Sequence, residues 1–308
     1  MILLSRHVSV CTAILVLGLS WPAWSLDDNC LSDARLTATP LDILLTNDDG
    51  YDQPGIVALH RALTEAGHRV LLAAPARNAS GSSTSLTLAP IAVRQIEANI
   101  YAVQASPATA VLLAVSALFP DGPPDLVISG INKGANLGPA TPVSGTVGAT
   151  VAAALIARPP IPGIAVSTDP LTESETTPEN LQHLADTAQF VVRLVARLQQ
   201  ANCTGALLPR GVALNVNYPP VPRKAVKGLK LTHQGKGALF SLVYERAEDD
   251  GDTFMPDFTI LPQNDDRGDG DTGAFDAGYI TIVPIDADFT ADQATRSSLG
   301  KALGSLSP

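Results

Sequence analysis

Two adjacent carboxylates follow the first strongly apolar segment of the chain. Residues 42–46 read Asp-Ile-Leu-Leu-Thr, and Asn47-Asp48-Asp49-Gly50 follow directly. Neighbouring carboxylates repel each other unless a cation lies between them, so the pair indicates a metal site. Taken alone, the pair fits the cap of a following helix equally well. Phosphatases with an aspartate nucleophile need a second Asp two positions further on, and Gly50 at that place argues against this class.

Two later loops add neutral oxygen donors. Residues 77–82, which include Ser80, and residues 129–138, which include Asn132, each follow an apolar segment. Either loop alone could be an ordinary turn. Together with the carboxylate pair they offer hydroxyl and amide oxygens and no His or Cys, which is the ligand preference of a hard cation such as Mg²⁺ or Mn²⁺. The three loops together therefore predict a site for a divalent metal ion.

A phosphate site is predicted beside this metal site. Ser144-Gly145-Thr146 precedes a run of small residues that predicts a helix to about residue 156. The free N–H groups and the dipole at a helix start favour an anion. Lys133 adds a cation that could contact phosphate, and a merely solvated lysine fits as well. The predicted phosphate contacts are Asn132, Lys133, Ser144, Gly145 and Thr146.

Alternating apolar segments and helical patterns must position these loops. Strands are expected at residues 42–46, 69–74, 125–129, 164–167 and 212–216, with helices at 54–66, 107–118, 144–156 and 177–200. This order predicts an α/β fold with a doubly wound, mainly parallel sheet. Ligands of such sheets bind at the carboxyl ends of the strands, where the three loops begin.

The character of the sequence changes after the proline-rich residues 219–222. Strand-like pieces then alternate with acidic, Gly-rich loops, which indicates a β-rich C-terminal extension over residues 223–296 that could be exchanged between subunits. The acidic run 265–271 lacks the spacing of a calcium loop and is interpreted as a solvated loop. Residues 297–308 are small and polar, and we expect a flexible tail.

The N-terminus has the pattern of a secretory signal peptide. Arg6 and His7 precede an apolar run at 8–19, and Ala23-Trp24-Ser25 supplies small residues for cleavage. Residues 1–25 are therefore predicted to be removed, which leaves a mature segment 26–40 before the core. The alternative is an uncleaved anchor helix, but the run is short for a bilayer. We expect a periplasmic or secreted protein without a membrane span after leader removal.

The net charge limits the possible binding partners, and the cysteine content limits the possible disulfides. The 308 residues carry a formal net charge of -10, so binding to a nucleic-acid polymer through phosphate contacts is not expected. Cys11 leaves with the leader, and Cys30 and Cys203 remain either as a disulfide or as two thiols. The sequence also lacks the Gly-rich dinucleotide, P-loop and nucleophile-elbow motifs.

These motifs together resemble the survival protein SurE family. They lie at residues 43–50, 54–56, 74–75, 77–81, 129–132 and 144–147, with later blocks at 214–219, 232–235, 271–272 and 278–284. The resemblance implies a Rossmann-like catalytic core at 41–222 and a homodimer or homotetramer with an exchanged extension. It also implies that one divalent metal ion is held by Asp48, Asp49, Ser80 and Asn132. It also implies a metal-dependent phosphomonoesterase that hydrolyses nucleoside 5′- and 3′-monophosphates. Most of the family is cytoplasmic, which is the alternative location.

The resemblance and the residues leave some assignments open. Asp48 and Asp49 are the expected catalytic residues, with Asp48 orienting or deprotonating the attacking water. Residues 105–110 depart from the family pattern Gly-Thr-Pro-x-Asp-Cys near the substrate, so the family's nucleotide preference is not carried over. The rival interpretations are an exported protein that binds a phosphorylated ligand without cleaving it, and a broad-specificity acid phosphatase.

Overall fold

A nine-stranded sheet forms the centre of the computed structural model, which describes residues 39–119, 121–174, 176–201, 206–237, 240–247, 252–261 and 270–304. The predicted signal peptide, most of the segment 26–40, Cys30 and Cys203 lie outside the described residues. Across the described ranges, none of the helices combines the length and the apolar character that a bilayer crossing requires.

The order of the strands confirms the α/β prediction. Neighbours in the sheet run β3-β4-β2-β1-β5-β6-β7-β11-β8. All neighbouring strands from β4 to β7 pair in parallel, whereas β3 and β11 are antiparallel to the core strands beside them. The strands are β1 (Asp42–Thr46), β2 (Arg69–Pro75), β3 (Val93–Glu97), β4 (Ile100–Val103), β5 (Leu126–Lys133), β6 (Gly163–Thr168), β7 (Ala213–Tyr218), β8 (Leu229–Leu231) and β11 (Ile280–Ile285).

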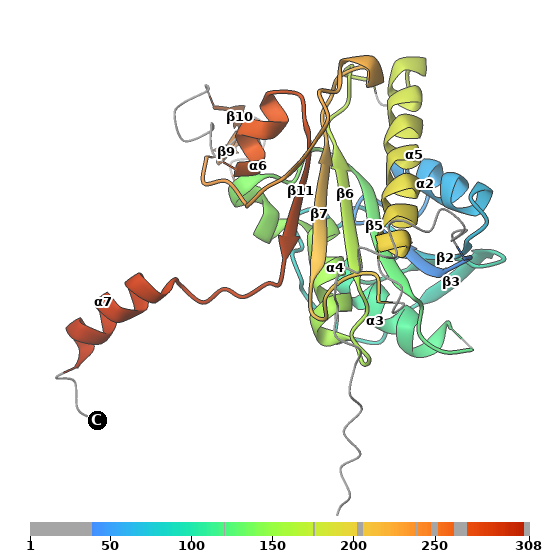
Figure 1. Cartoon of the computed structure of the whole chain (residues 1–308), viewed down its shortest axis with the longest axis horizontal. Helices are drawn as coiled ribbons and strands as arrows, with labels where there is room; N and C mark the ends of the chain where they lie inside the picture. The colour runs from blue at the N-terminus through green and yellow to red at the C-terminus, as the bar shows by residue number, and fades with distance from the viewer. Residues whose placement is uncertain are drawn as a thin grey trace, which may run out of the picture.

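Helices cover both faces of the sheet (Figure 1). On one face α2 (Pro54–Glu65) and α5 (Pro178–Ala201) bury apolar residues at helical spacing, such as Leu59 and Val191, against the strands. On the other face α3 (Pro107–Ala117) and α4 (Gly145–Val151) pack mainly through alanines. A π-helical turn at Ala152–Ile156 continues α4, which agrees with the predicted helix end.

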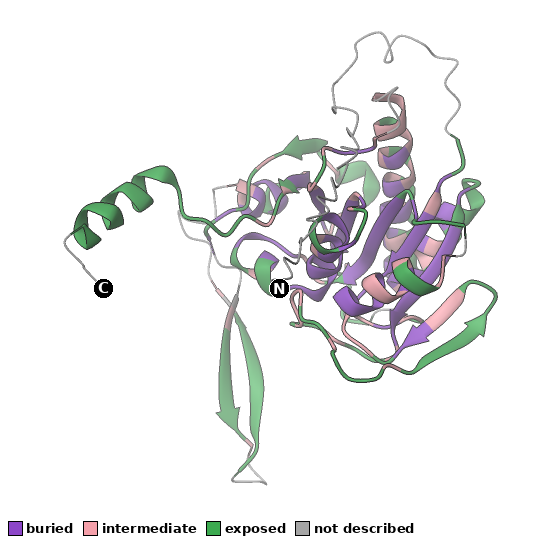
Figure 2. Ribbon diagram, turned by 90° about the horizontal axis from the view of Figure 1, so that it is seen from below, coloured by how far each residue is buried: buried purple, intermediate pink, exposed green. Residues whose placement is uncertain are grey.

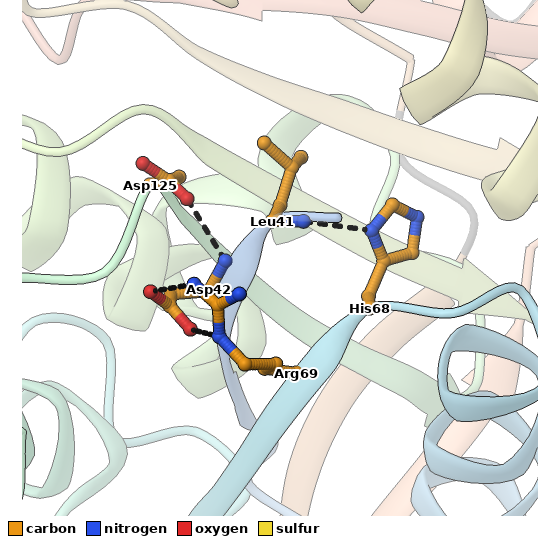
Figure 3. Close-up of polar contacts among 5 residues, drawn as sticks. All are labelled: Leu41, Asp42, His68, Arg69 and Asp125. Atoms are coloured by element: carbon orange, nitrogen blue, oxygen red, sulfur yellow. Dashed lines mark hydrogen bonds and ion pairs between the residues drawn. The ribbon is translucent and has the colours of Figure 1, made fainter. Parts of the chain in front are cut away.

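The amino-terminal edge of the sheet is fastened by polar contacts (Figure 3). Arg69 donates from Nε to Asp42 Oδ1 over 2.5 Å, and the Asp42 backbone N–H donates to Asp125 Oδ2 over 2.8 Å. The Leu41 N–H donates to Nδ1 of His68 over 3.2 Å. These contacts join the starts of β1 and β2 to the turn before β5, so they fix the strand register at the edge opposite the predicted site.

The C-terminal part of the chain both extends the sheet and projects from it. Strands β8 and β11 complete the sheet beside β7. A separate two-stranded hairpin of β9 (Phe240–Arg246) and β10 (Phe254–Ile260) projects from the body, as does α7 (Gln293–Leu303) (Figure 2). Residues 297–303 were expected as part of a tail but belong to α7. Asp292 precedes this helix as its N-cap, and its side chain accepts a hydrogen bond from Thr295 N over 2.7 Å.

Asp271 corrects one prediction about the acidic run 265–271. It lies in α6 (Gly270–Asp276) and is fully buried, whereas a solvated loop was expected. Its carboxylate accepts hydrogen bonds from the N–H groups of Gly235 over 2.7 Å and Gly138 over 3.2 Å. The local sequence is acidic, but these long-range donors satisfy the carboxylate in the interior. The rest of the run, residues 265–269, lies outside the described residues.

Candidate active site

The turn after β1 brings Asp48 and Asp49 to the carboxyl edge of the sheet. Asn47 closes this turn, because its side chain donates from Nδ2 to Gly50 O over 2.8 Å and accepts from Gly50 N over 3.2 Å. Gly50 has a φ of 130°, a conformation that residues with a Cβ rarely adopt. The sequence therefore needs both Asn and Gly to project the two carboxylates from the strand end.

Asp48 is held against the start of α4. Its carboxylate is 2% exposed and accepts a short hydrogen bond from the Thr146 hydroxyl. Burial raises the pKa of the Asp48 carboxyl, and hydrogen bonds from the Thr146 side chain and from the backbone N–H groups of Thr146 and Gly145 act in the opposite direction. Ser144 caps the helix, with its Oγ accepting from Val147 N over 3.2 Å. In the structure, these groups at the start of α4 face the Asp48 carboxylate. Their contacts to phosphate stay a prediction.

Gly145 lies between Asp48 and the serine-rich loop. A Cβ at this position would lie 2.6 Å from Ser82 Oγ and 2.8 Å from Asp48 Oδ2, so both side chains face the glycine closely. The Ser82 hydroxyl is buried and has no hydrogen-bond partner among the described residues. Sequence reasoning missed Ser82, because the loop offers four serines between positions 80 and 85 and nothing in their spacing distinguishes this one.

The end of β5 reaches Asp49, because this strand continues through Asn132 and Lys133, which the sequence placed in the following loop. The Lys133 N–H donates to Asp49 Oδ2 over 3.0 Å. Asn132 is buried, and its side chain donates from Nδ2 to Gly134 O over 2.7 Å. Because this bond fixes the amide nitrogen, the Asn132 amide oxygen is the end left for a ligand.

The loop after β2 joins the same place. The Ala79 N–H donates to the backbone oxygen of Asp48 over 2.7 Å, which brings the neighbouring Ser80 beside the carboxylate pair. Ser80 is exposed, and its N–H donates to Asn78 Oδ1 over 2.9 Å. The structure thus brings together the three loops that the sequence indicated.

A pocket of about 150 Å³ opens beside these loops. Asp49, Asn78, Asn132 and Lys133 line one part of it. The remaining lining comes from the first turn of α2, the end of β6 and the start of α5, and comprises Gln53, Pro54, Gly55, Ile131, Thr168, Pro170, Asn180, His183 and Leu184. Two of the predicted ligands, Asp49 and Asn132, therefore border a cavity large enough for part of a small molecule.

A buried amide network fastens the loop that follows Asn132 and Lys133 at the end of β5. Asn217 accepts from Asn136 N over 2.8 Å, and Asn215 donates to Asn136 O over 2.8 Å. Asn136 in turn donates from Nδ2 to Ser167 Oγ over 2.8 Å. All of these residues are buried, so β6 and β7 hold the loop through polar contacts that an apolar side chain could not replace.

The donor set fits a hard divalent cation. Among the described residues no group of three or more His, Cys, Asp or Glu side chains could hold a metal. The Asp48–Asp49 pair would therefore need neutral oxygens to complete the ligand shell, and the oriented Asn132 amide oxygen and the Ser80 hydroxyl are of that type. A buried carboxylate next to a second one is also costly without a positive charge nearby.

The comparisons with known proteins agree with this arrangement. The family model described as "Survival protein SurE" matches residues 43–240. The chain belongs to the SurE family. It is 37% identical to 5′-nucleotidase SurE 1 of Burkholderia lata over 264 residues, which cover 84% of this chain and 96% of that protein. It is 36% identical to the 5′-nucleotidase SurE of Xanthomonas campestris pv. campestris over 84% of this chain and 94% of the relative.

A solved structure supports the same assignment. The SurE protein from Aquifex aeolicus superposes with a TM-score of 0.67 at 30% identity and covers 85% of this chain and 99% of that one. The SurE fold predicted from the motifs is thereby confirmed.

Residues 105–110, which depart from the family sequence pattern, lie at the start of α3 in this SurE protein. Ser106 caps the helix, and its hydroxyl donates to Ser85 O over 2.6 Å. Thr109, at the place of the family Asp, accepts from Thr87 N over 2.8 Å. These side chains hold the serine-rich loop, and the pocket beside Asp49 is lined by other segments.

Proposed function

We propose that this SurE protein is a metal-dependent phosphomonoesterase that hydrolyses nucleoside 5′- and 3′-monophosphates to nucleoside and phosphate. The observation that carries the proposal is the meeting of the end of β5 with the loops after β1 and β2 around Asp48 and Asp49, beside an open pocket. Membership of a family whose relatives are named 5′-nucleotidases supports the same chemistry.

One divalent ion, Mg²⁺ or Mn²⁺, would be held by Asp48, Asp49, Ser80 and Asn132. When bound, such an ion neutralises charge on a phosphoryl group and makes water more acidic. The Asn132 amide oxygen is oriented for this role by the bond from its nitrogen to Gly134 O.

The protein's own groups would orient the reactants. The Thr146 hydroxyl and the start of α4 fix the Asp48 carboxylate, which would orient the attacking water and accept its proton. Asp49, fixed through the Lys133 N–H, would help to hold the ion. Lys133 and residues 144–146 would contact phosphate oxygens as negative charge develops on them.

Asp48→Asn tests the assignment. We expect phosphate release from AMP in the presence of Mn²⁺ to fall at least about a thousandfold, since the variant loses the carboxylate charge and keeps the shape of the side chain. The thermal midpoint should change little. Asp52→Asn is the matched control, because Asp52 is exposed in the same turn, and its activity should equal that of the wild type. EDTA should stop hydrolysis, and Mn²⁺ or Mg²⁺ should restore it.

The same assay separates the rival functions. Binding of AMP without phosphate release by the wild type would favour a binding protein. Equal hydrolysis of sugar phosphates, polyphosphate and nucleotides in a substrate panel would favour a broad-specificity phosphatase. Full activity of Asp48→Asn would refute the catalytic assignment.

We also propose that the mature protein is exported and oligomeric. The leader-like residues 1–25 support export to the periplasm or the medium. Intact-mass measurement of the exported fraction would support this if the chain begins at Leu26. An unprocessed chain in the cytoplasm would contradict it. The projecting hairpin β9–β10 and helix α7 support a dimer or tetramer, since both carry exposed apolar residues.

A further inference from the structure

One short segment joins two parts of the candidate site along the chain. Gly138–Val143 forms a 3₁₀ helix, the connecting segment, between the end of β5 and the start of α4. The chain before it leads back to Asn132, and the residue after it is Ser144, which caps α4. A shift of the connecting segment would therefore move the start of α4, where the Thr146 hydroxyl holds Asp48.

The connecting segment also holds the serine-rich loop. Its Pro142 O accepts from the Ser83 hydroxyl over 2.7 Å, and its Val143 O accepts from Ser83 N over 3.1 Å. Ser83 is next to Ser82, whose hydroxyl faces Gly145 closely. The serine-rich loop and the start of α4 thus share one support.

The C-terminal extension contacts the first residue of the connecting segment at both backbone groups. The N–H of Gly138 lies 3.2 Å from each carboxylate oxygen of Asp271, and Gly138 O accepts from Gln234 Nε2 over 2.9 Å. A Cβ on Gly138 would lie 3.0 Å from Gly237 O and 3.1 Å from Thr272 Oγ1. The extension therefore surrounds this residue closely and fixes where the connecting segment begins.

The buried carboxylate of Asp271 is suited to this contact. It also accepts from Gly235 N over 2.7 Å and from Thr272 N over 2.8 Å. Burial raises the pKa of Asp271, and the hydrogen bonds from these N–H groups act in the opposite direction. An apolar side chain in its place would leave buried N–H groups without an acceptor, so the carboxylate is needed to hold Gly138.

We propose that Asp271 is a positioning residue of the active site, which fixes the connecting segment through the backbone N–H of Gly138. The inference rests on the proposed function, because it concerns the geometry of the same site. The C-terminal extension is then a working part of the site, although none of its described residues lines the pocket beside Asp49.

The variant Asp271→Ala tests the inference through phosphate release from AMP in the presence of Mn²⁺. We expect kcat to fall about tenfold, because Asp48 and the start of α4 lose their position. KM should change less than about threefold, because other segments line the pocket. Asp271→Asn keeps the one oxygen that all three N–H groups reach, so it should recover most of kcat.

Two further variants separate positioning from stability. Phe275→Leu changes a buried residue of the same helix α6 and removes no hydrogen bond, so it should lower the thermal midpoint and keep the wild-type kcat. Gln234→Ala removes the donor to Gly138 O at an exposed position, so it should keep the wild-type thermal midpoint and lower kcat about threefold.

Hydrogen–deuterium exchange reports on the same segments without turnover. In Asp271→Ala and Gln234→Ala, residues 138–147 and 80–85 should exchange faster than in the wild type, whereas Phe275→Leu should leave them unchanged. Wild-type kcat and wild-type exchange in Gln234→Ala and in folded Asp271→Ala, or an equal loss of kcat in Phe275→Leu, would overturn the inference. Gln234→Ala decides alone if Asp271→Ala does not fold. A wild type that releases no phosphate from AMP would overturn the proposed function, and the exchange comparison would still decide whether Asp271 positions these segments.

Discussion

At the scale of single residues, the site depends on how closely side chains approach Asp48. The carboxylate is buried, accepts from the Thr146 hydroxyl, and faces Gly145 with no room for another carbon atom. A glycine here is required by packing, since its φ is ordinary and only the neighbouring side chains exclude a Cβ.

Gly145→Ala should therefore disturb the site directly. The new Cβ would lie 2.8 Å from Asp48 Cβ, so the carboxylate must move, and we expect a loss of at least about tenfold in kcat/KM. Overpacking of this kind costs about 1–3 kcal/mol of unfolding free energy, which urea denaturation would measure. Gly300→Ala, in α7 with nothing within 4 Å of the new Cβ, should be neutral or slightly stabilising. Full activity of Gly145→Ala would contradict the placement of Asp48.

At the scale of elements, the loop after β5 is positioned by strands that contribute no predicted ligand. Asn215 and Asn217 of β7 bond to both backbone groups of Asn136, and Ser167 of β6 accepts from its side chain. Strand β6 pairs in parallel with β5, and β7 pairs in parallel with β6, so the sheet itself sets the position of the chain beside Asn132.

Asn217→Ala should weaken this support. The Asn136 N–H would lose its acceptor in a buried place, which costs about 1–3 kcal/mol of unfolding free energy. We also expect weaker binding of Mn²⁺, measured by calorimetry, because the loop that follows Asn132 and Lys133 loses a support. Gln95→Ala on the exposed strand β3 is the control and should change stability by less than about 0.5 kcal/mol. A stability equal to that of the wild type would show that the network is dispensable.

At the scale of the whole molecule, the projecting hairpin presents an apolar face. Leu242 pairs with Phe258 and lies on the same face as Tyr244, and Tyr244 and Phe258 are 64% and 58% exposed. These exposed apolar side chains on a projecting arm are the basis of the proposed contact with a second copy of the chain.

The variant Tyr244→Ser/Phe258→Ser should shift the protein toward a single chain. Removing two aromatic side chains lowers the apolar area that association would bury, so light scattering after gel filtration should report a smaller mass than for the wild type. Val57→Ser, which changes an exposed residue of α2, should leave the mass unchanged. An unchanged mass in the double variant would exclude the hairpin as a contact.

The sequence by itself determined the family, the parallel core and the residues at the strand ends. Apolar segments with strand and helix periodicity fix the order of elements, and a parallel order places the loops after β1, β2 and β5 at one edge. Within the segments at these strand ends, the resemblance to the SurE motifs singles out Asp48, Asp49, Ser80 and Asn132.

Only the tertiary structure decided what surrounds these residues. The burial of the Ser82 hydroxyl and of Asp271, the contact of Thr146 with Asp48 and the contact of His183 with Thr168 each depend on groups from separate segments of the chain. The helix at 293–303 was also missed, since a polar and small-residue segment gives little periodicity. Local sequence carries propensity and pattern, whereas the state of a buried polar group is set by partners far away along the chain.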